Sequence, residues 1–271
     1  MTTMTTKIRL MAFALIVATF SVQCTKDDAA TPDYPTSIDS YFTAGSYTYE
    51  GVEVKYRESS IQPQAGGSTA LVIVLHGQNV SGSDNQSQLR SDAMIRIWYN
   101  LTNGGNKAIL LAPQCTPKRA WDEKSGDVRG ATMAEILKAL IDDYVVRKTN
   151  IDTNRIYLLG YSDGSQPAGA GGVWRMLSDY PDLFAAGMSV AADPDDSILV
   201  ENVAKTAVLS VKGEMDSHAV ALTLESFGDQ VRDAGGQLRE VILNVRSRED
   251  LCREAFSAEH LSWVLQYTKS R

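Results

Sequence analysis

One short segment combines residue types that can perform nucleophilic chemistry. Residues 155–165 read Arg-Ile-Tyr-Leu-Leu-Gly-Tyr-Ser-Asp-Gly-Ser, an apolar run that leads directly into G-x-S-x-G with Ser162 at its centre. In this motif the serine occupies a tight turn from a strand to a helix, which lifts its hydroxyl clear of the sheet. Gly160 and Gly164 flank it, because a side chain at either place would collide with a neighbouring element. We predict Ser162 as the nucleophile; the alternative is a Gly/Ser-rich turn in another α/β fold.

A nucleophilic serine needs a base within hydrogen-bond reach, a carboxylate that orients the base, and two N–H donors for the developing oxyanion. Residues 76–79 follow an apolar strand that ends at Leu75. The main-chain N–H of Gln78, in this loop, and that of Asp163, directly after the serine, are the predicted oxyanion donors. His76 is interpreted as a structural residue that braces the loop.

The carboxylate is expected in a loop after a later strand. Asp216 fits this position, because it follows the apolar run 207–212. An acidic cluster after the preceding strand provides the alternatives: Asp193, Asp195 and Asp196. Such a cluster is more typical of a solvated turn, so Asp216 is the predicted acid.

The base is the least certain member of the set, because the chain has only three histidines. His260 follows the last expected strand and completes the order Ser, Asp, His, so it is the predicted base. It also falls within the final expected helix, where a capping or solvent-facing role is the alternative. His218 lies only two residues after Asp216, yet it stays a second alternative.

The remaining sequence predicts the elements that must position these groups. Alternating Tyr and Val residues on either side of Glu50-Gly51 indicate an antiparallel hairpin at 47–56, and 71–75 reads as a strand buried on both faces. Further strands are expected at 107–112, 155–160, 185–191, 207–212 and 237–244, and helices at 131–147, 174–179, 219–234 and 253–267. Repeated β-α units after a hairpin predict a mostly parallel central sheet with helices on both faces, in one domain at 41–271.

From Leu71 onward the chain resembles the α/β-hydrolases, in particular secreted esterases grouped with polyhydroxybutyrate depolymerases, feruloyl esterases and phospholipase/carboxylesterase-like proteins. The matching segments are 74–77, 111–114, 121–122, 154–164, 180–186 and 213–216. The resemblance implies the α/β-hydrolase fold, Ser162 as nucleophile, Asp216 as acid and no cofactor. It also implies that Trp121 lines the substrate cleft, with a core tryptophan as the alternative.

The chain departs from this family at two places. The segment 249–256 fits the frame that normally begins with the catalytic histidine, and Glu249 stands at the histidine position. A carboxylate is a much weaker base at neutral pH unless burial raises its pKa. The protein is therefore expected either to use His260 through a local rearrangement or to be an impaired relative. After the serine motif, Ser165 replaces a common glycine and the glycine-rich 166–172 is a poor helix former, which suggests a looser site.

The first residues are expected to be a targeting signal, 1–23, of lipoprotein type. Lys7 and Arg9 precede an apolar run, Leu10–Val22, that is short for a membrane span. Cys24 follows it and resembles the lipidation site of bacterial lipoproteins. An ordinary secretory signal with a fortuitous cysteine is the alternative.

The segment 24–40 is rich in Asp, Thr, Pro and Ser and is predicted to be a linker. Its residues 25–28, Thr-Lys-Asp-Asp, resemble an export tag of surface lipoproteins. We expect an extracytoplasmic protein, at the outer membrane or cell surface if it is lipidated and secreted or periplasmic otherwise. Membrane contact is expected only through the N-terminal lipid anchor.

Composition limits the partners. The chain has 271 residues, 44% hydrophobic, and a net charge of −7 without a long basic run, so nucleic acid is not an expected partner. No Cys/His spacing typical of a zinc site occurs. Cys115 and Cys252 could form a disulfide outside the cytoplasm or remain two buried thiols.

Together these features predict a secreted or surface-tethered serine hydrolase that cleaves carboxylic esters, small or polymer-linked. Two alternatives stay open. A lactonase would use the same site. A non-catalytic binding protein could retain the cleft of a hydrolase, and the glutamate at position 249 is the best argument for it.

Overall fold

The computed structural model describes residues 33–59, 68–104, 108–162, 169–214 and 218–269. Contacts divide the chain into two units, Met1–Asp33 and Tyr34–Arg271. The fold described below is that of the second unit.

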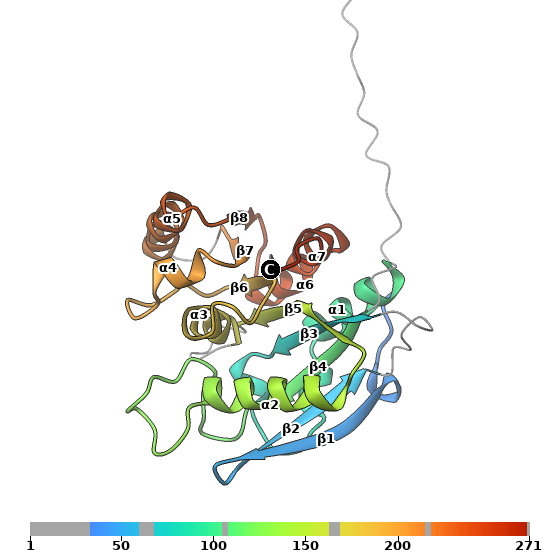
Figure 1. Ribbon diagram of the computed structural model, residues 1–271. Coiled ribbons are helices and arrows are strands. Elements are labelled where there is room, and N and C mark those ends of the chain that lie inside the picture. Colours follow the sequence, from blue (N-terminus) through green and yellow to red (C-terminus); the bar gives the residue numbers. More distant parts are fainter. Residues whose placement is uncertain (1–32, 60–67, 105–107, 163–168, 215–217, 270–271) are drawn as a thin grey trace, which may run out of the picture. The chain divides into compact units, whose positions relative to one another are not determined.

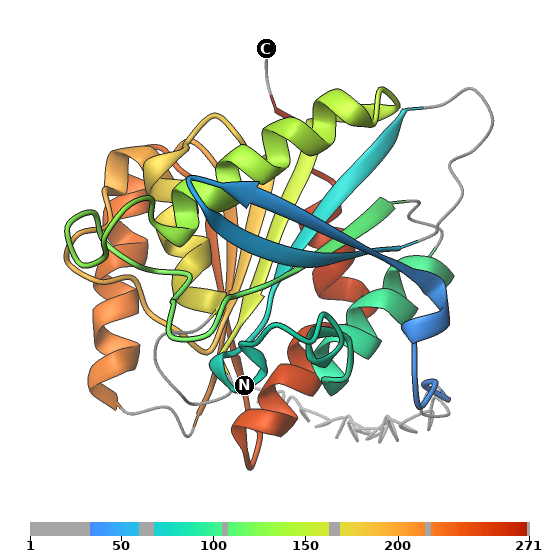
Figure 2. The ribbon, with the colours of Figure 1, turned by 90° about the horizontal axis from the view of Figure 1, so that it is seen from below.

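The second unit is built on an eight-stranded sheet with the order β1-β2-β4-β3-β5-β6-β7-β8 (Figures 1 and 2). Only the pairs β1–β2 and β2–β4 are antiparallel; every other pair is parallel. The strands are β1 (Phe42–Tyr49), β2 (Val52–Ser59), β3 (Thr69–Leu75), β4 (Ala108–Gln114), β5 (Ile151–Tyr161), β6 (Ala186–Val190), β7 (Ala207–Gly213) and β8 (Leu238–Leu243). The predicted mostly parallel sheet with an N-terminal hairpin is confirmed.

Helices cover both faces of this sheet, as Figure 2 shows. The helices are α1 (Asp92–Asn103), α2 (Met133–Arg147), α3 (Gly169–Asp179), α4 (Val200–Val203), α5 (His218–Asp233), α6 (Arg248–Ala255) and α7 (Ala258–Leu265). Side chains of α1, α6 and α7 form one hydrophobic core with the sheet, and those of α2, α3 and α5 form another. A sheet buried on both faces explains why β3, β4 and β7 are continuous apolar runs rather than alternating ones.

The hairpin forms where the sequence predicts it. Glu50 and Gly51 connect β1 to β2, and both have positive φ, 47° and 80°. Two left-handed residues in a row match the twist of the paired strands, so this turn is one that tight hairpins favour. Glycine at the second position removes the steric cost there.

The C-terminal helix differs from the expectation. The sequence predicts one helix over 253–267, but the structure has α6 and α7 with a break at Phe256 and Ser257. The Ser257 hydroxyl accepts the main-chain N–H of His260 at 3.2 Å and so caps a new helix. Helices α1 and α4 were not predicted.

The start of the folded unit also differs. The sequence assigns 24–40 to a linker, yet Ile38 is fully buried in the core and Tyr34 packs on α1. The ring of Tyr34 lies 4.8 Å from that of Tyr99, and the guanidinium of Arg96 lies 4.0 Å above it. The domain therefore begins at Tyr34, because these contacts fix the segment that precedes β1.

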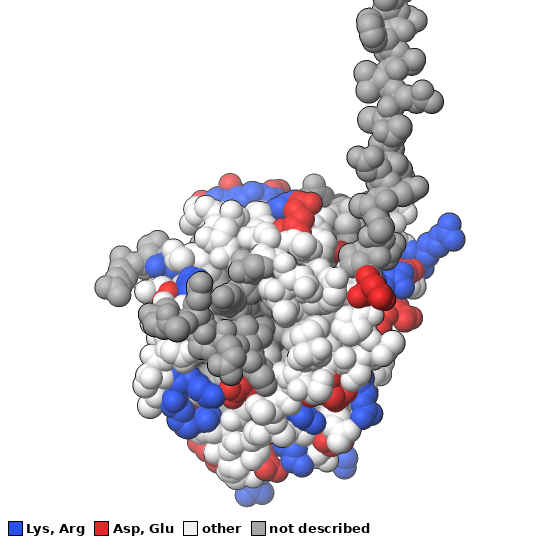
Figure 3. Space-filling view, turned by 90° about the vertical axis from the view of Figure 1, so that its right-hand side faces the viewer, with Lys and Arg blue, Asp and Glu red and all other residues white. Residues whose placement is uncertain are grey.

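On the part of the face in Figure 3 that is not drawn grey, acidic and basic residues both occur toward the edge, and uncharged residues lie between them. Such a mixed distribution agrees with the modest net charge of −7. No helix within the described residues is long and apolar enough to cross a membrane.

Candidate active site

Ser162 lies directly after β5, in the middle of the parallel part of the sheet. Its main-chain N–H donates to the carbonyl of Val190 in β6 at 3.0 Å. Its own carbonyl accepts the thiol of Cys252 in α6, with 3.2 Å between sulfur and oxygen. The serine backbone is thus fixed between a strand and a helix. The residue is 0% exposed in this structure.

The chain can turn from β5 to α3 because two glycines bring their backbones together. A Cβ atom on Gly160 would lie 2.2 Å from the carbonyl oxygen of Gly169, at the start of α3. A Cβ atom on Gly169 would lie 2.1 Å from the carbonyl oxygen of Leu75, at the end of β3. Both distances are far below van der Waals contact, so only glycine fits. This agrees with the turn geometry that the sequence predicts around Ser162.

Two further glycines in α3 also lie where a Cβ atom would collide with a neighbouring segment. A Cβ atom on Gly172 would lie 2.5 Å from the Cβ of Trp121, and one on Gly171 would lie 2.9 Å from Oδ2 of Asp122. The glycines lower the helix propensity of this segment, and the sequence therefore suggests a loose helix. In the structure they instead allow α3 to pack closely against the loop that carries Trp121 and Asp122. Burial, as the largest cause, raises the pKa of Asp122.

The loop after β3 is braced by His76, as predicted. Its Nε2 accepts the main-chain N–H of Cys115 at 2.9 Å, and its Nδ1 contacts the carbonyl of Gly77 at 2.5 Å. Because a carbonyl can only accept, Nδ1 carries the proton and the ring is neutral. Leu75, the last residue of β3, is in register with Gly160 of β5. The loop that contains Gln78 therefore begins at the end of the strand next to the one that Ser162 follows.

Trp121 supports the same loop. Its Nε1 donates to the carbonyl of His76 at 3.1 Å, and the two rings meet edge to face with centroids 5.4 Å apart. The residue is only 2% exposed and offers almost no surface to a substrate in this structure. The contacts of Trp121 with His76 favour the alternative that it is a core residue. No described contact supports its place in a substrate cleft, which stays a prediction.

A buried carboxylate that the sequence analysis missed holds the loop of Trp121. Both oxygens of Glu123 accept from the guanidinium of Arg119 at 2.6 Å. The same carboxylate accepts the main-chain N–H groups of Ala120 at 2.9 Å and Met133 at 3.0 Å. The spacing of four residues between Arg119 and Glu123 could have indicated an ion pair. Nothing in the sequence shows that this pair is buried.

Several predicted residues lie outside the described part of the site. Asp163 and Asp216 fall in the gaps at 163–168 and 215–217, and the side chain of His218 at the start of α5 is also not described. Asp216 follows β7, which ends at Gly213 two strands from β5. These roles therefore stay predictions.

The rival acids have other partners. The carboxylate of Asp193 forms an ion pair with Lys212, a buried residue near the end of β7. Asp195 lies 3.3 Å from the ammonium of Lys124 and also accepts from the hydroxyl and N–H of Ser197. The hydrogen bonds from Ser197 and Lys124 hold the pKa of Asp195 below its usual value despite partial burial. Asp193 and Asp195 thus each form an ion pair with a lysine.

His260, the predicted base, is buried in the first turn of α7. Its Nδ1 donates to the carbonyl of Ala255, the last residue of α6, at 2.7 Å. The contact closes the corner between the two helices. It leaves Nε2 as the acceptor nitrogen, which is the tautomer that a base requires.

A salt bridge beside His260 relates this corner to the register of the sheet. Glu259, next to His260, pairs with Arg239 of β8 at 3.1 Å. Arg239 is in register, through β7 and β6, with Leu159 of β5. Leu159 precedes Ser162 by three residues, about 10 Å along a strand. No described contact joins His260 to Ser162, so its catalytic role also stays a prediction.

Glu249, at the histidine position of the family frame, is exposed in the first turn of α6. Two neighbours on this helix reach the site, although the sequence analysis gave neither a role there. Arg248 donates to the carbonyl of Ala191 after β6 at 3.3 Å, and Cys252 donates to that of Ser162.

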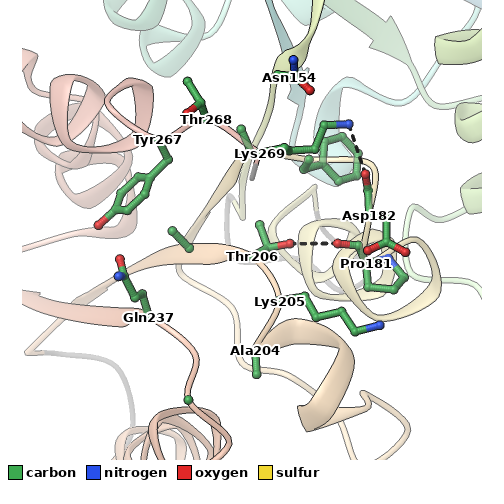
Figure 4. A pocket seen from close by; sticks show the side chains of 14 residues that line it. Asn154, Pro181, Asp182, Ala204, Lys205, Thr206, Gln237, Tyr267, Thr268 and Lys269 are labelled. Atoms are coloured by element: carbon green, nitrogen blue, oxygen red, sulfur yellow. Dashed lines mark hydrogen bonds between the residues drawn. The ribbon is translucent and has the colours of Figure 1, made fainter. Parts of the chain in front are cut away.

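A groove of about 550 Å³ lies at the opposite, amino edge of the sheet (Figure 4). Lys269 donates its ammonium to the carbonyl of Asp182 at 3.1 Å, and Thr206 donates to that of Pro181 at 3.3 Å. Burial lowers the pKa of Lys269. The Lys269 side chain holds the C-terminal segment against the loop before β6, and its main-chain N–H donates to the carbonyl of Asn154 in β5 at 3.0 Å. The groove is separate from the serine site. Among the described residues no group of three His, Cys, Asp or Glu could hold a metal ion.

The strand order, the antiparallel β2 and the serine turn between β5 and α3 are those of the α/β-hydrolase fold, and the chain has this fold. No protein-family model matches the chain, and no curated protein matches it. Solved structures do, and three of them are described next.

A thermostable esterase is 22% identical with a TM-score of 0.70, over 84% of this chain and 64% of that protein. A ferulic acid esterase is 14% identical with a TM-score of 0.62, over 83% and 97%. The S-formylglutathione hydrolase of Staphylococcus aureus is 12% identical with a TM-score of 0.58, over 83% and 98%. The chain thus spans just under two thirds of the thermostable esterase, and at these identities the likeness establishes the fold.

We predict that Gly160→Ala destabilises the protein by about 3 kcal/mol, because the new methyl group meets the backbone of α3. Gly187→Ala is the matched control in the next strand. Its Cβ would meet the flexible tip of Leu177 at 2.9 Å, so the expected loss is about 1 kcal/mol. Urea unfolding followed by circular dichroism measures both; equal losses would contradict the close approach.

We predict that Cys115 and Cys252, which are buried and not joined in a disulfide, resist thiol reagents in the folded protein. Burial, with a smaller contribution from Glu123, raises the pKa of Cys115 to about 12. At pH 8 its thiolate fraction is then on the order of 10⁻⁴. In a Cys24→Ser variant, Ellman's reagent should detect two thiols only after unfolding. Detection of none after unfolding would indicate a disulfide.

Proposed function

We propose that this protein is a serine hydrolase that cleaves carboxylic esters through an acyl-enzyme on Ser162. The observation that carries the proposal is the serine turn between β5 and α3, closed by the backbone contact of Gly160 with Gly169. That contact brings the start of α3 against the end of β5, and Ser162 is the residue that follows β5. The likeness of the fold to esterases supports the same conclusion.

In the proposed reaction the Ser162 hydroxyl attacks the ester carbonyl while a base removes its proton. The main-chain N–H groups of Gln78 and Asp163 hold the oxyanion, and collapse of the tetrahedral intermediate expels the alcohol, which takes up the proton. Water then attacks the acyl-enzyme and releases the acid. Asp216 orients the base, for which His260 is the first candidate and His218 the second. The reaction needs no cofactor.

A non-catalytic binding protein is the second candidate function, and two observations favour it. Glu249 is exposed at the family's histidine position, and Ser162 is fully buried. A lactonase would share the parts of an esterase, so substrate profiling separates those two.

The primary test is hydrolysis of p-nitrophenyl acetate and butyrate by the folded domain. We predict that Ser162→Ala lowers kcat by roughly 10⁴-fold or more, because the acyl-enzyme cannot form. His260→Gln and His218→Gln identify the base, since the correct one should lose a comparable factor. Labelling of Ser162 by a fluorophosphonate supports the nucleophile independently. A protein that neither turns over esters nor is labelled favours the binding function.

We also propose that the domain is tethered outside the cytoplasm through a lipid on Cys24. The short basic region, the apolar run and the cysteine at position 24 support this proposal. In a Gram-negative bacterial host, metabolic labelling with an alkynyl palmitate should mark the protein, and Cys24→Ala should abolish the label. Persistence of the label in that variant contradicts the assignment.

A further inference from the structure

One face of α6 makes polar contacts with the ends of two neighbouring strands. Arg248 and Cys252 are four residues apart and therefore lie on the same side of the helix. Cys252 donates its thiol to the carbonyl of Ser162 at 3.2 Å, and Arg248 donates to the carbonyl of Ala191 at 3.3 Å. The first carbonyl follows β5 and the second follows β6.

Ala191 is a strained residue. Its φ is +66°, in the left-handed region that residues with a Cβ atom rarely adopt. Its N–H donates to the carbonyl of Val211 at 3.0 Å, so both of its main-chain polar groups are held. Backbone strain of this kind persists only where the surroundings fix it, and it gathers at functional sites.

This strained residue is linked to the nucleophile through one hydrogen bond. Val190, directly before Ala191, accepts the N–H of Ser162 at 3.0 Å. The serine main chain is therefore held on its N–H side by a strand whose end Arg248 fixes, and on its carbonyl side by Cys252. Both constraints come from α6.

Apolar packing keeps the helix in place for this purpose. Cys252 is buried with Ala255 and Phe256 in the core below the sheet. The ring of Phe256 meets that of Tyr161 edge to face, with centroids 6.1 Å apart. Tyr161 directly precedes Ser162. A shift of α6 would therefore move Tyr161 together with the main chain of Ser162.

We propose that Arg248 and Cys252 are positioning residues of the serine turn. Cys252 contacts the main chain of Ser162 directly, and Arg248 acts on it through Ala191 and Val190. Together they set the orientation of the Ser162 hydroxyl. The proposal rests on the proposed function of Ser162 as nucleophile.

The test compares kcat and KM for p-nitrophenyl acetate and the rate of Ser162 labelling by a fluorophosphonate. Cys252→Ala should lower kcat and the labelling rate about threefold, the effect of losing a weak hydrogen bond. Arg248→Gln should lower both about tenfold, as expected for a charged donor. KM should stay within about twofold of the wild-type value, because neither residue contacts the substrate. Cys252→Ser and Arg248→Lys, which keep a donor, should recover most of the rate.

Arg253→Gln is the matched control, because Arg253 lies on another face of α6 and pairs with Asp250. It should leave all rates unchanged. Hydrogen exchange of the Ser162 amide provides a readout that does not need catalysis, and it should accelerate in Cys252→Ala and Arg248→Gln only. An active wild type with unchanged rates and exchange in both variants overturns the positioning role. A wild-type protein that neither hydrolyses the ester nor is labelled overturns the proposed function. In that case, unchanged exchange of the Ser162 amide in Cys252→Ala and Arg248→Gln overturns the positioning role as a separate result.

Discussion

The site depends on one steric constraint, the direct contact of three backbone segments at the end of β5. Gly160 approaches Gly169, and Gly169 approaches the carbonyl of Leu75, at distances where a Cβ atom would lie 2.2 and 2.1 Å from an oxygen. Removing either glycine forces α3 away from the sheet. The helix could then no longer begin directly beside the turn that holds Ser162. The strand that carries the nucleophile and the loop that is expected to carry the oxyanion donor are therefore placed by the same contact.

Close backbone contact leaves carbonyl groups buried, and the surrounding side chains satisfy them. The indole of Trp121 donates to His76, the thiol of Cys252 donates to Ser162, and the guanidinium of Arg248 donates to Ala191. An unpaired buried carbonyl costs free energy, so each donor stabilises the loop that it reaches. The described polar residues around the serine thus serve first to hold main chain.

The sequence predicts the fold well where burial alone determines the local structure. The apolar run of β3 and the glycine turn after β1 need no tertiary information, and both were predicted correctly. The break at Ser257 was missed because the apolar pattern continues through it, and only the hydrogen bond to His260 reveals the cap. The packing of Tyr34 was missed for a similar reason, since a polar, proline-containing segment reads as a linker until its aromatic partner on α1 is known.

Within the site, the serine turn could be predicted and the base could not, and the reason is geometric. Strand order fixes where a residue after β5 must lie, whereas a histidine on a helix can face any direction. His260 has the tautomer of a catalytic base, but its Nδ1 proton points to the carbonyl of Ala255 rather than to a carboxylate. A carbonyl orients the ring without supplying the negative charge that stabilises an imidazolium. Within the described residues, the groups for proton transfer are therefore what remains to be assigned, whereas the position of the nucleophile is fixed by the fold. Oxyanion donors and substrate binding alone can still accelerate hydrolysis by roughly 10³-fold over water, so a slow esterase and a binding protein are neighbouring outcomes of the same fold.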